Sequence, residues 1–155
     1  MRGLLLLSCA VAVVAVAALP AAAERVPLRP DDKNAETTHI VTGVVKGVYS
    51  RDKETGLYGP GTVETQVVIE IEIKTVEKGA GLKPGDLVYA RSWRLKKRGT
   101  FGNRPGPSGH FLIPQEGDAV RAYLARGSYP PTGQGDNGYT VVYPNGLDKI
   151  DKVKK

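Results

Sequence analysis

The stretch VETQVVIEIEIK, from Val63 to Lys74, decides the fold. Its odd-numbered positions are all Val, Thr or Ile, whereas its even-numbered positions are Glu, Gln or Lys with the exception of Val68. Successive side chains of a strand point to opposite faces of a sheet. The pattern therefore predicts a long strand with its odd-numbered face in a core and its even-numbered face in water. A helix is not expected, because the apolar residues do not recur at intervals of three and four.

Four further apolar stretches, each bounded by turn residues, are predicted as strands. The first is rich in Val and is interrupted by Gly43 and Gly47, a pattern typical of bulges that bend a strand around a small barrel. The four predicted strands are His39–Ser50, Leu87–Arg94, Ala119–Ala125 and Tyr139–Tyr143.

Glycine and proline mark the connections between these strands. Lys83-Pro84-Gly85-Asp86 carries Pro and Gly at the two central positions that define a type II turn. The same Gly-Asp pair, Gly117-Asp118, precedes the fourth strand. Three longer stretches, residues 50–61, 95–114 and 126–138, are rich in Gly and Pro and are predicted as loops.

These elements predict one all-β domain, a small five-stranded OB-like Greek-key barrel with long irregular loops, over residues 38–147. Residues 24–37 contain Pro and charged residues and little to bury, so we expect a flexible leader there. Residues 148–155 are predicted to form a charged, frayed tail. The usual OB helix between the third and fourth strands has no counterpart in the sequence.

The order of elements from Ile40 to Tyr143 resembles the netrin-like inhibitory domains, such as tissue inhibitors of metalloproteinases. The resemblance rests on the Val-rich first strand and on a long alternating strand that ends in Val76-Glu77-Lys78-Gly79. Those inhibitors depend on an N-terminal cysteine and disulfides, which a mature chain would lack. Trp93, the run Gly106-Pro107-Ser108-Gly109-His110, Pro114 and Gly117-Asp118 are similar to small exported proteins of unknown function in planctomycete-type bacteria. This second resemblance implies a family and no activity.

The first 23 residues have the layout of a secretory signal peptide. A short positive start, Met1-Arg2-Gly3, precedes an uncharged apolar run from Leu4 to Leu19, and Ala21-Ala22-Ala23 supplies small residues for cleavage. A membrane anchor or a lipid-modified Cys9 are the alternatives. We expect cleavage after Ala23, export to the periplasm or beyond, and no membrane span in the mature form.

Removal of the signal would change both charge and redox chemistry. The whole chain has 22 basic and 16 acidic residues and a formal net charge of +6. Loss of Arg2 reduces this charge to +5, and loss of Cys9 removes the single cysteine. Disulfides, thiol catalysis and cysteine-bound metals are then excluded.

The segment from Leu87 to Gln115 contains no Asp or Glu, and we expect it to attract an anionic partner. Aromatic rings lie between its basic residues, as in sites that stack on bases or sugars. The alternative is a solvated loop that only keeps the protein soluble. The candidate ligand-binding residues of this segment are Arg91, Trp93, Arg94, Lys96, Lys97, Arg98, Arg104 and His110.

An acidic polysaccharide or another exported protein is the expected partner. Nucleic acid is not expected, because the outward face of the long strand carries Glu64, Glu70 and Glu72, which would repel phosphate on the face that OB domains commonly use. Tyr58 and Tyr129, in the loops after the first and fourth strands, form a second candidate ligand site. Packing on the barrel rim is the alternative for Tyr58.

The two histidines, His39 and His110, are far apart in the sequence, so we expect no metal site and no cofactor. Ser108 and His110 could form a nucleophilic pair, which makes a hydrolytic enzyme one alternative. A more ordinary role for His110 is to hydrogen-bond backbone and pin the Gly-rich segment onto the barrel. The sequence thus favours a non-enzymatic exported binding module, and a protease-inhibitor-like module is the second alternative.

Overall fold

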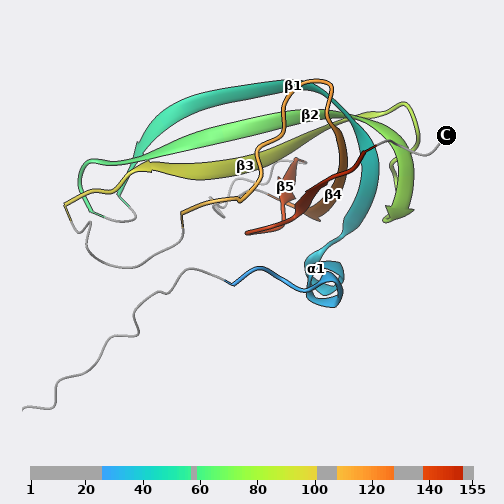
Figure 1. Cartoon of the computed structure of the whole chain (residues 1–155), viewed down its shortest axis with the longest axis horizontal. Coiled ribbons are helices and arrows are strands. Elements are labelled where there is room, and N and C mark those ends of the chain that lie inside the picture. The colour runs from blue at the N-terminus through green and yellow to red at the C-terminus, as the bar shows by residue number, and fades with distance from the viewer. Residues whose placement is uncertain (1–25, 57–58, 101–107, 128–137, 152–155) are drawn as a thin grey trace, which may run out of the picture.

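The computed structural model describes residues 26–56, 59–100, 108–127 and 138–151. The predicted secretory signal and the candidate residues Tyr58, Arg104 and Tyr129 lie outside these residues. The described chain is mostly β-sheet with one short helix (Figure 1). Its elements are α1 (Pro30–Glu36), β1 (His39–Thr55), β2 (Thr62–Lys78), β3 (Leu87–Lys97), β4 (Ala119–Arg126), β5 (Tyr139–Val141) and β6 (Leu147–Lys149).

Five strands close into a ring in the order β1-β2-β3-β5-β4, because β4 also pairs with β1. The β3–β5 pair is parallel and the other pairs are antiparallel. This confirms the predicted all-β, OB-like arrangement. The ring is uneven: β1, β2 and β3 run side by side far beyond the short strands β4 and β5 (Figure 1).

The core lies inside the ring and confirms the predicted register of the long strand. Ile69, Ile71 and Ile73 are completely buried, while Glu70 and Glu72 on the opposite face are partly exposed. Register shifts occur next to Gly43 and Gly47, where bulges were predicted in β1. The buried residues of the main core are Val41, Val45, Val67, Ile69, Ile71, Ile73, Val88, Ala90, Val120, Ala122, Leu124, Tyr139, Val141 and Leu147.

Two predicted turns are confirmed. Gly85 and Gly117 have φ values of 91° and 87°, the left-handed region that a type II turn requires at this position. In both turns the aspartate backbone N–H donates to the carbonyl three residues earlier, Asp86 to Lys83 and Asp118 to Gln115. The carboxylates of Asp86 and Asp118 accept from the backbone N–H of the same partners, at 3.0 and 2.9 Å.

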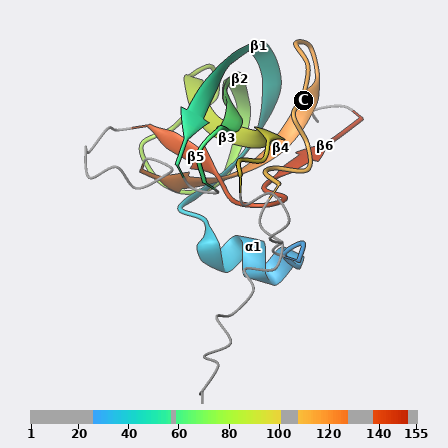
Figure 2. The same ribbon diagram turned by 90° about the vertical axis from the view of Figure 1, so that its left-hand side faces the viewer.

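The prediction of a flexible leader over residues 24–37 is wrong for its described part. Pro30 begins α1, and Asp31 and Asp32 lie in its first turn, where acidic side chains favour the helix dipole. Lys33 is 5% exposed, and its ammonium contacts the Asp148 carboxylate at 2.9 Å and lies 4.3 Å from the centre of the Tyr123 ring. Helix α1 therefore docks on the outside of the ring, below the strands in Figure 2.

The expected tail is also different in its described part. Leu147–Lys149 forms β6, which pairs with Val120–Ala122 of β4. It occupies the same edge of β4 as β5, since the other edge pairs with β1. Leu147 is buried in the core, which explains why a strand forms in a charged sequence.

The first and third strands are longer than predicted. β1 continues from Ser50 to Thr55, where the sequence predicted a loop. Cross-strand contacts replace the missing apolar residues: Arg51 donates to the Gln66 side chain, and Thr65 donates to the Asp52 carboxylate at 2.8 Å. β3 likewise continues from Arg94 to Lys97 along β2.

Candidate functional site

The basic residues predicted to form an anion-binding loop lie mainly on β3. Arg91 lies on the outer face of β3, opposite Val68, whereas Arg94 and Lys97 lie opposite Thr65 and Val63 on the other face, because a register shift separates Leu95 from Lys97. The Arg94 guanidinium donates to the backbone carbonyls of His110 and Phe111, and Lys96 pairs with Asp52. The structure therefore divides this charge between two faces and uses part of it internally.

Trp93 and His110 are buried, with 4% and 3% of their surfaces exposed. Trp93 lies on the outer face of β3, opposite Gln66, where residues 108–110 run along the edge of the strand. Its ring stacks on Tyr143 with centroids 5.8 Å apart, and the His110 ring meets both rings edge-on. These two candidate ligand residues are packed inside the protein.

Both ring nitrogens of His110 bind backbone. Nε2 donates to the Val141 carbonyl at 3.0 Å, and Nδ1 accepts from the Trp93 N–H at 3.3 Å. Burial lowers the pKa of His110, although the backbone carbonyls of Val141, 3.0 Å from Nε2, and of Trp93, 3.3 Å from Nδ1, oppose this shift. The neutral ring thus pins the segment after Ser108 onto the barrel, and neither nitrogen is available to activate the Ser108 hydroxyl.

The even-numbered face of β2 differs from the prediction at one end. Glu64 was expected in water but is only 4% exposed. Burial raises the pKa of Glu64, while Lys53 directly across on β1 lowers it. The adjacent Thr62 is completely buried and donates to the Gly59 carbonyl, and its oxygen accepts from the Gly99 N–H. The backbones of residues 59–62 and 99–100 meet beside Thr62, where the Thr100 N–H also donates to the Pro60 carbonyl.

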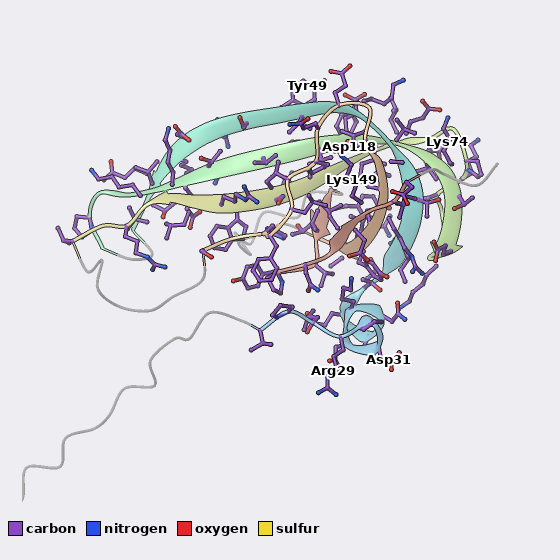
Figure 3. The ribbon with its side chains drawn as sticks, in the orientation of Figure 1. Arg29, Asp31, Tyr49, Lys74, Asp118 and Lys149 are labelled. Atoms are coloured by element: carbon purple, nitrogen blue, oxygen red, sulfur yellow. The ribbon has the colours of Figure 1, made fainter. Side chains whose placement is uncertain are left out.

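Two tyrosines are exposed on the outer face of the three long strands. Tyr49 on β1 is 57% exposed and Tyr89 on β3 is 51% exposed. Tyr89 lies directly across from Glu70 of β2, and Tyr49 lies on the outer side of β1, where Figure 3 labels it. Exposed aromatic residues on one sheet face are typical of binding surfaces.

Gly47 brings the Tyr49 ring into line with Glu70 and Tyr89. Gly47 pairs with Glu70, two residues along from the Tyr49–Val68 pair. A Cβ atom at Gly47 would lie 2.7 Å from the Tyr49 hydroxyl oxygen and 3.0 Å from Cζ, so the ring lies over the bare glycine. The Tyr49 hydroxyl then donates to Glu70 Oε2 at 2.9 Å. Tyr49, Glu70 and Tyr89 form a line across three strands, which we name the tyrosine row.

Charged side chains flank the tyrosine row. Arg91, directly across from Val68, lies two residues from Tyr89 on the same face of β3. On the other side, Glu72 contacts Lys46 at 3.5 Å and also pairs with Lys74. The Glu70 carboxylate raises the pKa of Tyr49, through its hydrogen bond and its negative charge. The Tyr49 phenol therefore stays neutral over the physiological pH range.

The tyrosine row offers flat apolar rings on either side of a carboxylate. Tyrosine supplies a large, rigid contact surface at a low cost in conformational entropy. A carboxylate forms strong hydrogen bonds with hydroxyl groups. The sequence predicted neither Tyr49 nor Tyr89 as a site residue, because the register of β3 against β2 places Tyr89 across from Glu70. Figure 3 shows Asp118 and Lys149 side by side elsewhere on the molecule, where they form a 2.6 Å ion pair.

The described part of the chain holds neither a cluster of metal-ligating side chains nor a long apolar helix. Within it, no three His, Cys, Asp or Glu side chains gather closely enough to hold a metal ion. The described helix is too short to cross a membrane. Comparison of the chain with protein-family models, curated proteins and solved structures gives no match.

Proposed function

We propose that this chain is an exported, non-enzymatic binding module that holds a glycan on the outer face of β1, β2 and β3. The tyrosine row carries the proposal: its two exposed rings can stack on the apolar faces of sugar rings, and Glu70 between them can accept hydrogen bonds from sugar hydroxyls. Export by the N-terminal signal would place the module among extracellular polysaccharides.

Acidic groups on the glycan would find Arg91 beside the row, on the same face of β3 as Tyr89. The net positive charge of the mature chain adds a general attraction for such polymers. Glu70 limits this attraction at the centre of the row. The proposed ligand therefore combines uncharged sugar faces at the row with acidic substituents toward Arg91.

The test compares binding of the mature chain to a neutral polysaccharide, dextran, and to two acidic ones, heparin and polygalacturonate. Tyr89→Ala should weaken binding about tenfold, the loss expected when one stacked ring is removed. Phe111→Ala is the matched control, because Phe111 is 45% exposed but lies in the loop after β3 and outside the row. Equal binding by the Tyr89→Ala variant and the wild type would refute the proposal.

The acidic part of the proposal has its own variant. Arg91→Gln removes the basic side chain beside the row without changing a residue of the main core, so the melting temperature should stay near that of the wild type. Heparin binding should fall in this variant, and in the wild type it should fall with added salt, because the screening length shrinks from about 10 Å at 0.1 M to about 3 Å at 1 M. Unchanged heparin binding would leave only a neutral glycan as the ligand.

A further inference from the structure

Among the described residues, no strand pairs with the outer edge of β1 over its second half. β4 pairs with β1 only from His39 to Val44, and the Val45 N–H and carbonyl bind Asp118 and Gly117. Beyond this point β2 pairs with β1 as far as Thr55, and no other strand of the described chain pairs with it. We name residues 50–55 the free edge.

The free edge stands clear of the barrel. Every residue from Tyr49 to Glu54 is exposed, which means that both faces of the strand reach solvent. Figure 1 shows β1 extending past the short strands β4 and β5 in this region. Unpaired backbone N–H and C=O groups along such an edge are a template for another strand.

The charges of the free edge alternate in sign. Arg51 and Lys53 point to one face of the strand, and Asp52 and Glu54 point to the other. The Asp52 carboxylate pairs with Lys96, a contact that lowers the pKa of Asp52, and Glu54 accepts from the Gly61 N–H at 3.0 Å. The extended conformation is thus fixed before any partner arrives, which reduces the entropy cost of docking.

This charge pattern disfavours a second copy of the chain as the partner. In a symmetric antiparallel dimer, the free edge of one copy would lie beside the free edge of the other. Side chains directly opposite one another share a face, so odd-numbered residues would lie opposite odd-numbered residues and even-numbered opposite even-numbered. Arg51 and Lys53 would then face basic or uncharged residues, and Asp52 and Glu54 would face acidic or uncharged ones. Like charges directly opposite one another destabilise a strand pair.

We propose that the free edge of β1 binds an extended segment of a different protein by strand addition, and that this segment alternates acidic and basic residues. An acidic side chain of the partner lies across from Arg51 and Lys53, and a basic one lies across from Asp52 and Glu54. Backbone hydrogen bonds supply the attachment, and the alternation sets the register. This inference is independent of glycan binding at the tyrosine row.

The experiment is an NMR titration of the mature chain with the capped peptide Val-Lys-Glu-Lys-Glu-Val. Amide shifts should concentrate at residues 50–55. The isomer Val-Lys-Lys-Glu-Glu-Val has the same composition and charge, but it places like charges opposite one another and should bind about tenfold more weakly. Two further peptides, one N-methylated at its odd-numbered residues and the other at its even-numbered residues, each lack one set of backbone N–H donors. They distinguish backbone pairing from charge attraction. One of the two should lose binding.

Two variants of the chain complete the test. Arg51→Glu combined with Lys53→Glu should lose the alternating peptide, and its melting temperature verifies that it folds. Tyr89→Ala should keep the peptide, which distinguishes this site from the tyrosine row. Equal shifts from the two isomers, full binding by both N-methylated peptides, or a dimer of the chain that forms through the free edge would each overturn the proposal.

Discussion

At the scale of single residues, the outer face of β3 shows how neighbouring aromatic residues acquire different roles. Tyr89 and Trp93 lie on the same face of one strand, four residues apart. Residues 108–110 run beside Trp93, and Tyr143 stacks on it, whereas Tyr89 is left exposed. Trp93→Ala is therefore expected to destabilise the fold, and Tyr89→Ala is expected to affect binding only.

His110 is expected to make stability depend on pH. Its pKa is lowered in the folded protein by burial, from an ordinary value of 6.5, so the unfolded chain binds the proton more tightly. The stability that the neutral ring contributes is complete above about pH 6.5 and is lost as the pH falls toward the folded pKa, by up to about 1.4 kcal/mol per pH unit.

Melting temperatures between pH 7.5 and 5 would measure this effect in the wild type and in His110→Gln. The variant should be less stable throughout but should show a flatter pH dependence in this range. NMR titration of the His110 ring gives a direct second reading. A ring that titrates at or above its ordinary pKa would contradict the prediction.

At the scale of elements, the type II turn before β4 depends on glycine for a backbone reason alone. Gly117 has a φ of 87°, and a Cβ atom placed there would meet nothing within 4 Å. Gly117→Ala should therefore cost about 1–2 kcal/mol from the left-handed backbone conformation. Urea denaturation measures this cost. Gly56→Ala is the matched control, since that site is equally open and has no positive φ, and it should be neutral or slightly stabilising.

The attachment of α1 rests on Lys33. Its side chain is 7% exposed, while Asp148 is 44% exposed, so the pair lies between a buried and a surface salt bridge. Lys33→Ala should cost about 1–2 kcal/mol and should increase proteolysis of residues 26–38. Lys46→Ala removes a half-exposed ion pair with Glu72 and should change stability by less than about 0.5 kcal/mol. Equal losses in the two variants would show that burial of Lys33 is unimportant.

At the scale of the whole molecule, the structure joins the two ends of the described chain on one side of the ring. Leu28 and Asn145 exchange two hydrogen bonds, of 2.9 and 3.1 Å, and α1 contacts β6 through Lys33 and Asp148. The small cluster of Ile40, Tyr123 and Val142 lies under this junction and packs against Leu28. A mature chain must therefore keep the residues from Leu28 onward to complete the fold.

Cleavage after Ala23, as the sequence predicts, would leave Leu28 and α1 intact. N-terminal sequencing of the exported protein should find Glu24 as the first residue. A protein that still begins at Met1, or one that begins at a lipid-modified Cys9, would contradict the predicted signal.

The sequence by itself determined the all-β class, the inner face of β2 and the two Gly-Asp turns. These features depend on periodicity two and on the φ of single glycines, which are local properties. Only the tertiary structure decided which outer-face residues are covered. Trp93 is buried beside residues 108–110 and Tyr143, which are distant in sequence, whereas Tyr49 and Tyr89 are exposed. Such burial depends on long-range crossings of the chain, and no local pattern encodes them.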